Sequence, residues 1–321
     1  MSAPLLSLRG LSVAFGSASQ PVLAVNGVSL EIMPGGAVGL VGESGSGKSV
    51  TAMSILRLVG EPGRVTAGSI TFEGQDLLAM PAERLPEIRG RDIAMIFQEP
   101  MSSLNPLMTI GDQVAEAILL HEPMSTAARR ARVVELLGLV GMPDPASRLG
   151  AYPHQFSGGM RQRVMIAMAL ACRPKLLIAD EPTTALVVTI QAQVLELMKR
   201  IRAETGTAIL LISHDLGVIA EMCDRVVVLY GGRVVEEGAV RDIFRTATHP
   251  YTRGLLQSIP RLDDTRRRLS QIPGSVPLPG QITQGCPFRA RCDQRIARCE
   301  AEMPPLTAIS PDHRAACWVT A

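Results

Sequence analysis

Residues 38–49 read VGLVGESGSGKS, a short apolar run followed by a glycine-rich bend, a lysine and a serine. The spacing of Gly42, Gly47, Lys48 and Ser49 follows the pattern G-x-x-x-x-G-K-[ST]. Glycines let a backbone curl until successive N–H groups point at an anion, and a helix starting near Gly47 would add its positive dipole end. The stretch therefore predicts a site for nucleotide phosphates between a strand and a helix.

Different residues of this stretch are expected to contact different parts of the nucleotide. Lys48 can reach the β- and γ-phosphates as a point charge, and the Ser49 hydroxyl can sit on Mg²⁺. The remaining nucleotide contacts are expected from Gly42, Ser44, Gly45 and Gly47. A glycine-rich turn that fits the pattern by chance is the alternative, and the strand-like and helix-like flanks argue against it.

The composition is that of an ordinary globular protein. The 321 residues are 46% hydrophobic and 19% charged, with a net charge of +2, which gives no sign of a nucleic-acid surface. The N-terminal stretch lacks a basic leader, and no run approaches the roughly 20 apolar residues of a membrane helix. We expect a cytosolic chain whose role at a membrane comes through a partner.

Hydrophobic periodicity predicts alternating strands and helices, and hence a largely parallel sheet. Ligands of such sheets bind at the carboxyl ends of strands, where Gly42, Gln98, Asp180 and His214 all fall. The predicted strands cover residues 5–15, 22–32, 68–72, 93–97, 175–180 and 207–213, and the predicted helices cover 109–121, 125–140, 157–172 and 189–204.

Two acids, Asp180 and Glu181, follow a buried strand of Leu, Leu, Ile and Ala. Asp180 suits support of Mg²⁺, and Glu181 is placed to polarise a water for in-line attack on a γ-phosphate. The alternative is that Glu181 caps the next turn and orders Thr183 or Thr184, and from the residues alone both interpretations stay open.

Several phrases occur in a fixed order after the phosphate loop: Gln98, FSGGMRQR, LLIADEPTTAL and LLISHD. Together they resemble the ATP-binding cassette (ABC) ATPases. The resemblance implies an α/β P-loop NTPase cassette with a mixed sheet and a helical subdomain at about residues 100–172. It also implies that two cassettes pair head to tail around two ATP molecules. Each ATP would then contact Ser157, Gly158 and Gly159 of the opposite subunit, at the N-terminus of a serine-capped helix.

The same resemblance implies roles for three more residues. Gln98 would reach Mg²⁺ and the attacking water, and His214 would contact the γ-phosphate and hold the geometry of Glu181. Phe15 matches the aromatic residue on which adenine stacks, although it could equally be a core side chain.

One position departs from the family pattern. The family has Ala-Leu-Asp where this chain has Ala185, Leu186 and Val187. A valine cannot accept the hydrogen bonds of the missing acid. The chain could therefore bind ATP but hydrolyse it slowly, acting as a regulatory subunit or relying on a partner cassette. A tolerated substitution is the alternative.

The run HPYTRGLLQSIPRL at residues 249–262, then IPGSVPLP and GCPFRARC, resembles the C-terminal extension of ATP-binding subunits from oligopeptide and dipeptide ABC importers. We expect a cassette at residues 1–250 and an extension at 251–321. The implied partners are a second ABC ATPase subunit forming a heterodimer, two permease subunits and an extracytoplasmic binding protein. The chain would then lie peripherally at the cytoplasmic face of the membrane. Nickel or glutathione as cargo, and a soluble ABC protein acting on DNA or ribosomes, are the rivals.

Four cysteines fall in the last 36 residues, separated by 5, 6 and 17 residues: Cys286, Cys292, Cys299 and Cys317. Disulfides are disfavoured in a reducing cytosol, and the spacing lacks the short pairs common in zinc sites. The spacing alone predicts a metal site of open type. Resemblance to the importer extension implies a [4Fe–4S] cluster, with zinc as the alternative. We expect it to staple a tail that has little core of its own.

Overall fold

The computed structural model describes residues 3–17, 19–98, 103–183, 188–259, 271–282 and 284–320. The chain forms two compact units. The first contains Met1–Ala79 together with Leu211–Ala321, and the second contains Met80–Leu210.

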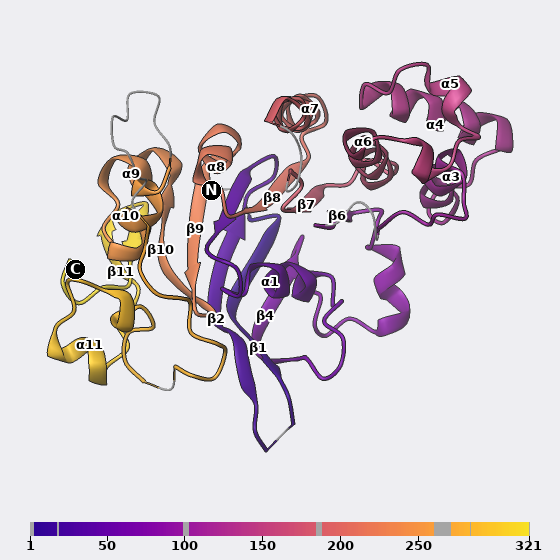
Figure 1. Ribbon diagram of the computed structural model, residues 1–321. Helices are drawn as coiled ribbons and strands as arrows, with labels where there is room; N and C mark the ends of the chain where they lie inside the picture. Colours follow the sequence, from indigo (N-terminus) through magenta and orange to yellow (C-terminus); the bar gives the residue numbers. More distant parts are fainter. Residues whose placement is uncertain are drawn as a thin grey trace. The chain divides into compact units, whose positions relative to one another are not determined.

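An antiparallel sheet of the first unit has the strand order β2-β1-β4-β5. Central strand β1 buries Leu6, Leu8, Leu11 and Val13, and its Leu6 lies opposite Ile32 of β2 and Phe72 of β4. β1 and β2, which run side by side in Figure 1, confirm the two strands predicted before the phosphate loop. The strand bounds are Leu6–Phe15 for β1, Val22–Ile32 for β2, Arg64–Phe72 for β4 and Gln75–Asp76 for β5.

The phosphate loop follows a strand of a second, mixed sheet in the same unit. Strand β3 (Ala37–Val41) is buried at every residue and pairs in parallel with β9 (Arg225–Tyr230). Parallel strands are covered on both faces, and helix α8 (Leu216–Met222) packs closely on β3. A Cβ at Gly39 would lie 2.6 Å from Ile219 of that helix, so the glycine permits the approach. Helix α1 (Lys48–Ile55) follows the loop.

The C-terminal residues extend this mixed sheet, which the sequence did not predict. Strand β10 (Arg233–Ala239) pairs antiparallel with β9 and with β12 (His313–Ala315), and β12 pairs with β11 (Thr307–Ser310). The many prolines do keep the other C-terminal elements short. These are α9 (Val240–Thr246), α10 (Pro250–Gln257), η3 (Arg289–Arg291) and α11 (Ala297–Ala301).

The second unit contains the parallel strands β6 (Ile93–Ile96) and β7 (Leu176–Asp180), together with a group of helices. Side chains of Thr109, Ser125 and Ser157 cap three of these helices, each by accepting a backbone N–H from the first turn. The predicted helices are confirmed to within a few residues. They are α3 (Ile110–Leu119), α4 (Thr126–Leu139), α6 (Gly158–Ala169) and α7 (Val188–Thr205), with η1 (Ala82–Glu87), α5 (Pro145–Arg148) and η2 (Pro153–Gln155) as shorter additions.

Strand β8 (Ala208–Ser213) spans the boundary between the two units in the sequence. Within the described ranges, no helix is both long and apolar enough to cross a membrane.

Candidate functional site

The phosphate loop requires glycine at defined positions. A Cβ at Gly42 would overlap the carbonyl oxygen of Leu229 on neighbouring β9. Gly47 has φ 100°, and a Cβ there would lie 2.7 Å from the Ala24 carbonyl oxygen. Any other residue at either position would have to displace backbone. The bend is therefore fixed by contacts with β2 and β9.

The loop encloses polar groups suited to anionic oxygens. Lys48 is buried, and its Nζ donates to the carbonyl oxygens of Gly42 at 2.7 Å and Glu43 at 3.0 Å. The hydroxyl of Ser46 is buried without a hydrogen-bond partner in the described part of the chain. Gly45 is exposed, and a Cβ there would meet no atom within 4 Å. A closed backbone cradle with an orphaned hydroxyl and an open rim fits bound phosphates.

The other predicted residues of the first unit lie at accessible positions. Ser44 is exposed, Ser49 is half-buried at the first turn of α1, and His214 is exposed directly after β8. The half-buried ring of Phe15 packs against the turn at Gly63, where a Cβ would lie 2.6 Å from the ring.

In the second unit, the ends of β6 and β7 bring two predicted residues into contact. The Gln98 side-chain amide donates to a Glu181 carboxylate oxygen at 3.0 Å. Asp180, the last residue of β7, is 4% exposed. Glu181 has φ 47°, a left-handed conformation that is uncommon for a residue other than glycine. This strained turn aims the Glu181 carboxylate at Gln98.

The N-terminus of α6 is open to solvent. The hydroxyl of Ser157 accepts the Met160 N–H at 3.4 Å, while Ser157 and Gly158 are exposed. Gly159 lets α7 approach, because a Cβ there would lie 2.7 Å from Ile190. Uncapped N–H groups at an exposed helix start can bind an anion. Val187, which carries the prediction of slow hydrolysis, lies outside the described residues.

The prediction of an iron–sulfur or zinc site at the four cysteines is wrong. In the described ranges, which include all four, no group of three or more His, Cys, Asp or Glu side chains could hold a metal ion. All four thiols are free: Cys286, Cys292, Cys299 and Cys317. Burial raises the pKa of the Cys286 thiol to about 11.

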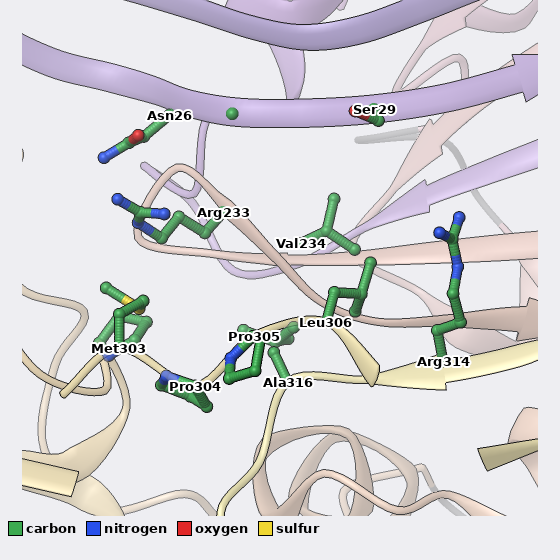
Figure 2. A pocket seen from close by; sticks show the side chains of 13 residues that line it. Asn26, Ser29, Arg233, Val234, Met303, Pro304, Pro305, Leu306, Arg314 and Ala316 are labelled. Atoms are coloured by element: carbon green, nitrogen blue, oxygen red, sulfur yellow. The ribbon is translucent and has the colours of Figure 1, made fainter. Parts of the chain in front are cut away.

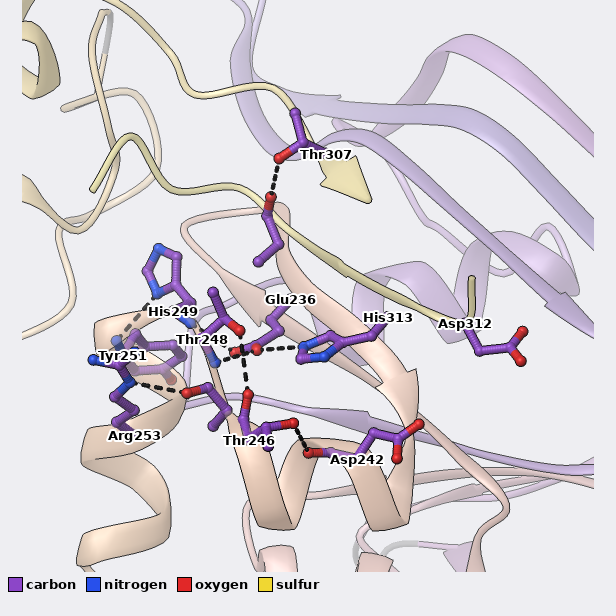
Figure 3. A network of polar contacts seen from close by, with 12 residues as sticks. Glu236, Asp242, Thr246, Thr248, His249, Tyr251, Arg253, Thr307, Asp312 and His313 are labelled. Atoms are coloured by element: carbon purple, nitrogen blue, oxygen red, sulfur yellow. Dashed lines mark hydrogen bonds and ion pairs between the residues drawn. The ribbon is translucent and has the colours of Figure 1, made fainter. Parts of the chain in front are cut away.

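The physical reason for this correction is that the extension is held by other contacts. A tail with little core of its own would need a metal site to hold it together. Instead β12 pairs with β10, and buried polar residues fix the chain around that pair. Figure 3 shows the carboxylate of Glu236, which is fully buried and accepts the backbone N–H groups of Thr248 at 2.6 Å and His249 at 3.0 Å. His313 Nε2 lies 2.7 Å from the same carboxylate.

The sequence also gave no indication that Glu43, Tyr251 and Arg291 meet at the phosphate loop. Glu43 occupies a variable position of the loop pattern, and Arg291 is 248 residues away. Tyr251 and Arg291 lie in the quoted runs HPYTRGLLQSIPRL and GCPFRARC, but neither run indicates a partner in the phosphate loop.

A cavity of about 350 Å³ lies between β2, β10 and the C-terminal residues. Figure 2 shows Asn26 and Ser29 of β2 across from Pro304, Pro305 and Leu306. Its lining includes none of the residues predicted for the ATP or cysteine sites.

Comparison with known families matches both parts of the chain. Residues 25–184 match the model described as "ABC transporter". Residues 235–299 match the model described as "Oligopeptide/dipeptide transporter, C-terminal region".

Full-length relatives are found among curated proteins. The dipeptide transport ATP-binding protein DppD of Bacillus subtilis is 50% identical, with 98% of this chain and 94% of that protein covered. DppD of Escherichia coli is 48% identical, with 98% and 96% covered. A putative peptide import ATP-binding protein of Brucella ovis is 50% identical, with 98% and 96% covered.

Among solved structures, the dimeric post-hydrolysis state of the ATP-binding cassette MJ0796, bound to ADP and Pi, is similar. The TM-score is 0.66 and the identity 29%, with 74% of this chain and 99% of that chain covered. The cbiO1 subunit of Clostridium perfringens shares the fold with a TM-score of 0.65 at 24% identity, covering 76% and 92%. The chain therefore belongs to the ABC transporter family, in the group whose ATP-binding proteins carry the oligopeptide/dipeptide transporter C-terminal region.

Proposed function

We propose that this chain is the ATP-hydrolysing subunit that powers import of peptides through a partner permease. The observation that carries the proposal is the near-50% identity, over 98% of the chain, to proteins named for peptide import or dipeptide transport. The names of the three curated relatives refer to peptides or dipeptides, which favours peptide cargo over nickel or glutathione.

The phosphate loop would hold the triphosphate of ATP. Gly42, Ser44, Gly45 and Gly47 would present backbone N–H groups to it, and Lys48 would turn its ammonium from the loop carbonyls toward the β- and γ-phosphates. Phe15 would stack on adenine. Mg²⁺, held by Ser49, Gln98 and Asp180, would supply charge neutralisation on the phosphates when bound.

Hydrolysis would depend on residues at the strand ends. Glu181 would accept a proton from the attacking water, while its hydrogen bond to Gln98 at 3.0 Å restricts the carboxylate to one orientation. His214 would contact the γ-phosphate. The strained backbone of Glu181 supports a functional rather than a purely structural role, because such conformations gather at active sites.

A second cassette would complete each ATP site. The exposed, serine-capped start of α6 supports this, because Ser157, Gly158 and Gly159 leave N–H groups available to a γ-phosphate of the opposite subunit. The similar solved cassette is described as a dimer bound to ADP and Pi. We propose a different ATPase subunit as the partner.

The wider assembly would include two permease subunits and an extracytoplasmic peptide-binding protein. The chain would then sit peripherally at the cytoplasmic face of the membrane. In this arrangement residues 1–250 form the cassette, with a helical subdomain at about 100–172, and residues 251–321 form the extension.

The test is ATP hydrolysis by the complex assembled with its permease and reconstituted in lipid. Wild-type complex should hydrolyse ATP in the presence of Mg²⁺. Glu181→Gln should keep ATP binding but lower turnover by roughly 10²–10⁴-fold, the range for loss of a general base. Full turnover by Glu181→Gln would show that another group activates the water.

A further inference from the structure

Residues far along the chain bind the phosphate loop at Glu43 through both its backbone and its side chain. Its backbone N–H donates to the hydroxyl of Tyr251 at 2.8 Å, and its carboxylate accepts Arg291 Nη1 at 2.8 Å. Its carbonyl oxygen accepts Lys48 Nζ at 3.0 Å and the Ser46 N–H at 3.2 Å. The N–H, the carboxylate and the carbonyl are therefore all engaged, two of them by residues more than 200 positions away.

The two distant partners are themselves firmly held. Tyr251 is fully buried at the first turn of α10, with its ring 4.6 Å from that of Tyr230 and 5.4 Å from that of Phe288. Burial, followed by the nearby charge of Glu43, raises the pKa of the Tyr251 phenol, so the hydroxyl stays neutral and can accept the loop N–H. The phenol position is thus set by packing rather than by the loop.

Of the two distant partners of Glu43, Arg291 is the one that brings a positive charge to the loop carboxylate. Its side chain is 6% exposed, and its guanidinium lies 5.8 Å from the ring centre of Tyr230 and 6.0 Å from that of Phe288. It also donates to the carbonyl oxygens of Pro273 at 2.9 Å and Ile272 at 3.2 Å. A planar guanidinium can donate to the carboxylate and to both carbonyl oxygens in fixed directions at once, a geometry that a lysine ammonium could not reproduce.

The extension also forms a wall beside the loop. Gly45, at the exposed rim of the cradle, lines a cavity of about 290 Å³ together with residues 277–280 and Pro287. The extension therefore lies beside the loop at Gly45 as well as at Glu43.

A carboxylate in a loop that must bind a triphosphate is unfavourable unless its charge is balanced. We propose that Arg291 and Tyr251 are positioning residues for nucleotide binding, through which the C-terminal extension neutralises Glu43 and holds the phosphate loop in its binding conformation. The inference rests on the proposed ATPase function. It makes the extension part of the ATP site, acting through Glu43 without touching the nucleotide.

The experiment measures the Kd of Mg-ATP for the full-length chain by equilibrium titration. Arg291→Ala leaves the Glu43 charge unbalanced and should raise Kd about tenfold, from Coulomb repulsion partly screened by salt. Arg289→Ala is the matched control. Arg289 lies in the same 3₁₀ turn but pairs with Glu300 within the extension, so its loss should change Kd less than about twofold.

Rescue distinguishes positioning from folding. The double variant Arg291→Ala with Glu43→Gln no longer carries the unbalanced negative charge at residue 43, so the Kd of Mg-ATP should return to within about threefold of wild type. A purely structural role for Arg291, through Pro273 and Ile272, would leave the double variant as weak as Arg291→Ala. Equal Kd values for Arg291→Ala and Arg289→Ala would overturn the proposal, and so would failure of the rescue.

Two further variants cover the remaining cases. If Arg291→Ala shows no cooperative melting, Glu43→Gln alone is decisive. It keeps an acceptor and removes the charge, so affinity should hold or rise, and a tenfold loss would refute the electrostatic argument. Lys48→Ala separates this inference from the proposed function. If wild type and Lys48→Ala bind ATP with equal Kd, the phosphate site itself is refuted. If Lys48→Ala loses affinity for ATP while Arg291→Ala keeps the wild-type Kd, only the role of the extension is refuted.

Discussion

Replacing Glu236 by alanine should destabilise the first unit more than any surface substitution. The Glu236 side chain is fully buried and accepts from two backbone N–H groups, at 2.6 Å from Thr248 and 3.0 Å from His249. It also contacts the ring of His313 at 2.7 Å (Figure 3). Alanine would leave all three groups buried without this acceptor.

The magnitude follows from those three contacts. Each of the three buried polar groups left unsatisfied costs about 1–3 kcal/mol. We expect Glu236→Ala to lower the free energy of unfolding by roughly 3–5 kcal/mol, since single substitutions rarely exceed about 5 kcal/mol. At about 1.5 °C for each kcal/mol in a chain of this size, the melting temperature should fall by roughly 5–8 °C.

The assay is thermal unfolding followed by circular dichroism. Glu236→Gln retains one acceptor oxygen and should lose roughly 1–3 kcal/mol, less than the alanine variant. Glu302→Ala is the control, because Glu302 forms a half-exposed pair with Arg298 that should contribute less than about 1 kcal/mol. Melting temperatures of Glu236→Ala and Glu302→Ala within 2 °C of each other, a difference of about 1 kcal/mol, would refute the reasoning.

Three other predictions concern the loop, a buried histidine and the cap of α6. Gly42→Ala should abolish ATP binding because its Cβ would overlap backbone atoms. Gly45→Ala would meet open space at φ 79°, so it should lower the free energy of unfolding by only about 1 kcal/mol in a melting assay. Burial, then the charge of Arg253, lowers the pKa of His249 to about 3 from 6.5. The unfolded chain therefore binds the extra proton below pH 6.5, and stability should fall between pH 6.5 and 3, by about 2 kcal/mol at pH 5. His249→Asn keeps a capping side chain and should flatten that slope in denaturant titrations; an unchanged slope would contradict the pKa shift. Ser157→Ala should cost about 1 kcal/mol of stability through the lost cap, and it should also slow hydrolysis by the assembled complex; unaltered turnover would count against the opposite-subunit site.

Local patterns were enough to predict most elements of the fold. Strand periodicity located β1 and β2, and serine or threonine at the N-cap located the starts of α3, α4 and α6. Gln98 and Glu181 could be placed at the ends of their strands, because both follow short apolar runs. Parallel pairing of β6 with β7 then brings these two side chains within 3.0 Å.

The rest depends on contacts between residues far apart in the chain. His313 joins Glu236 across 77 residues, and Arg291 joins Glu43 across 248. No local pattern encodes such a pairing. A glutamate inside the valine-rich strand β10 carries no sign of the donors that will surround it. The cysteine prediction is wrong for the same reason, because the spacing of the four residues does not determine whether packing makes them metal ligands or buried thiols.

The most direct test of the account is uptake of a labelled dipeptide into proteoliposomes that contain the assembled transporter. We expect uptake that requires ATP and Mg²⁺ on the side of this subunit and is lost in Lys48→Ala. Dipeptide uptake that proceeds equally with Lys48→Ala, or ATP-driven uptake of nickel or glutathione with none of peptide, would contradict it.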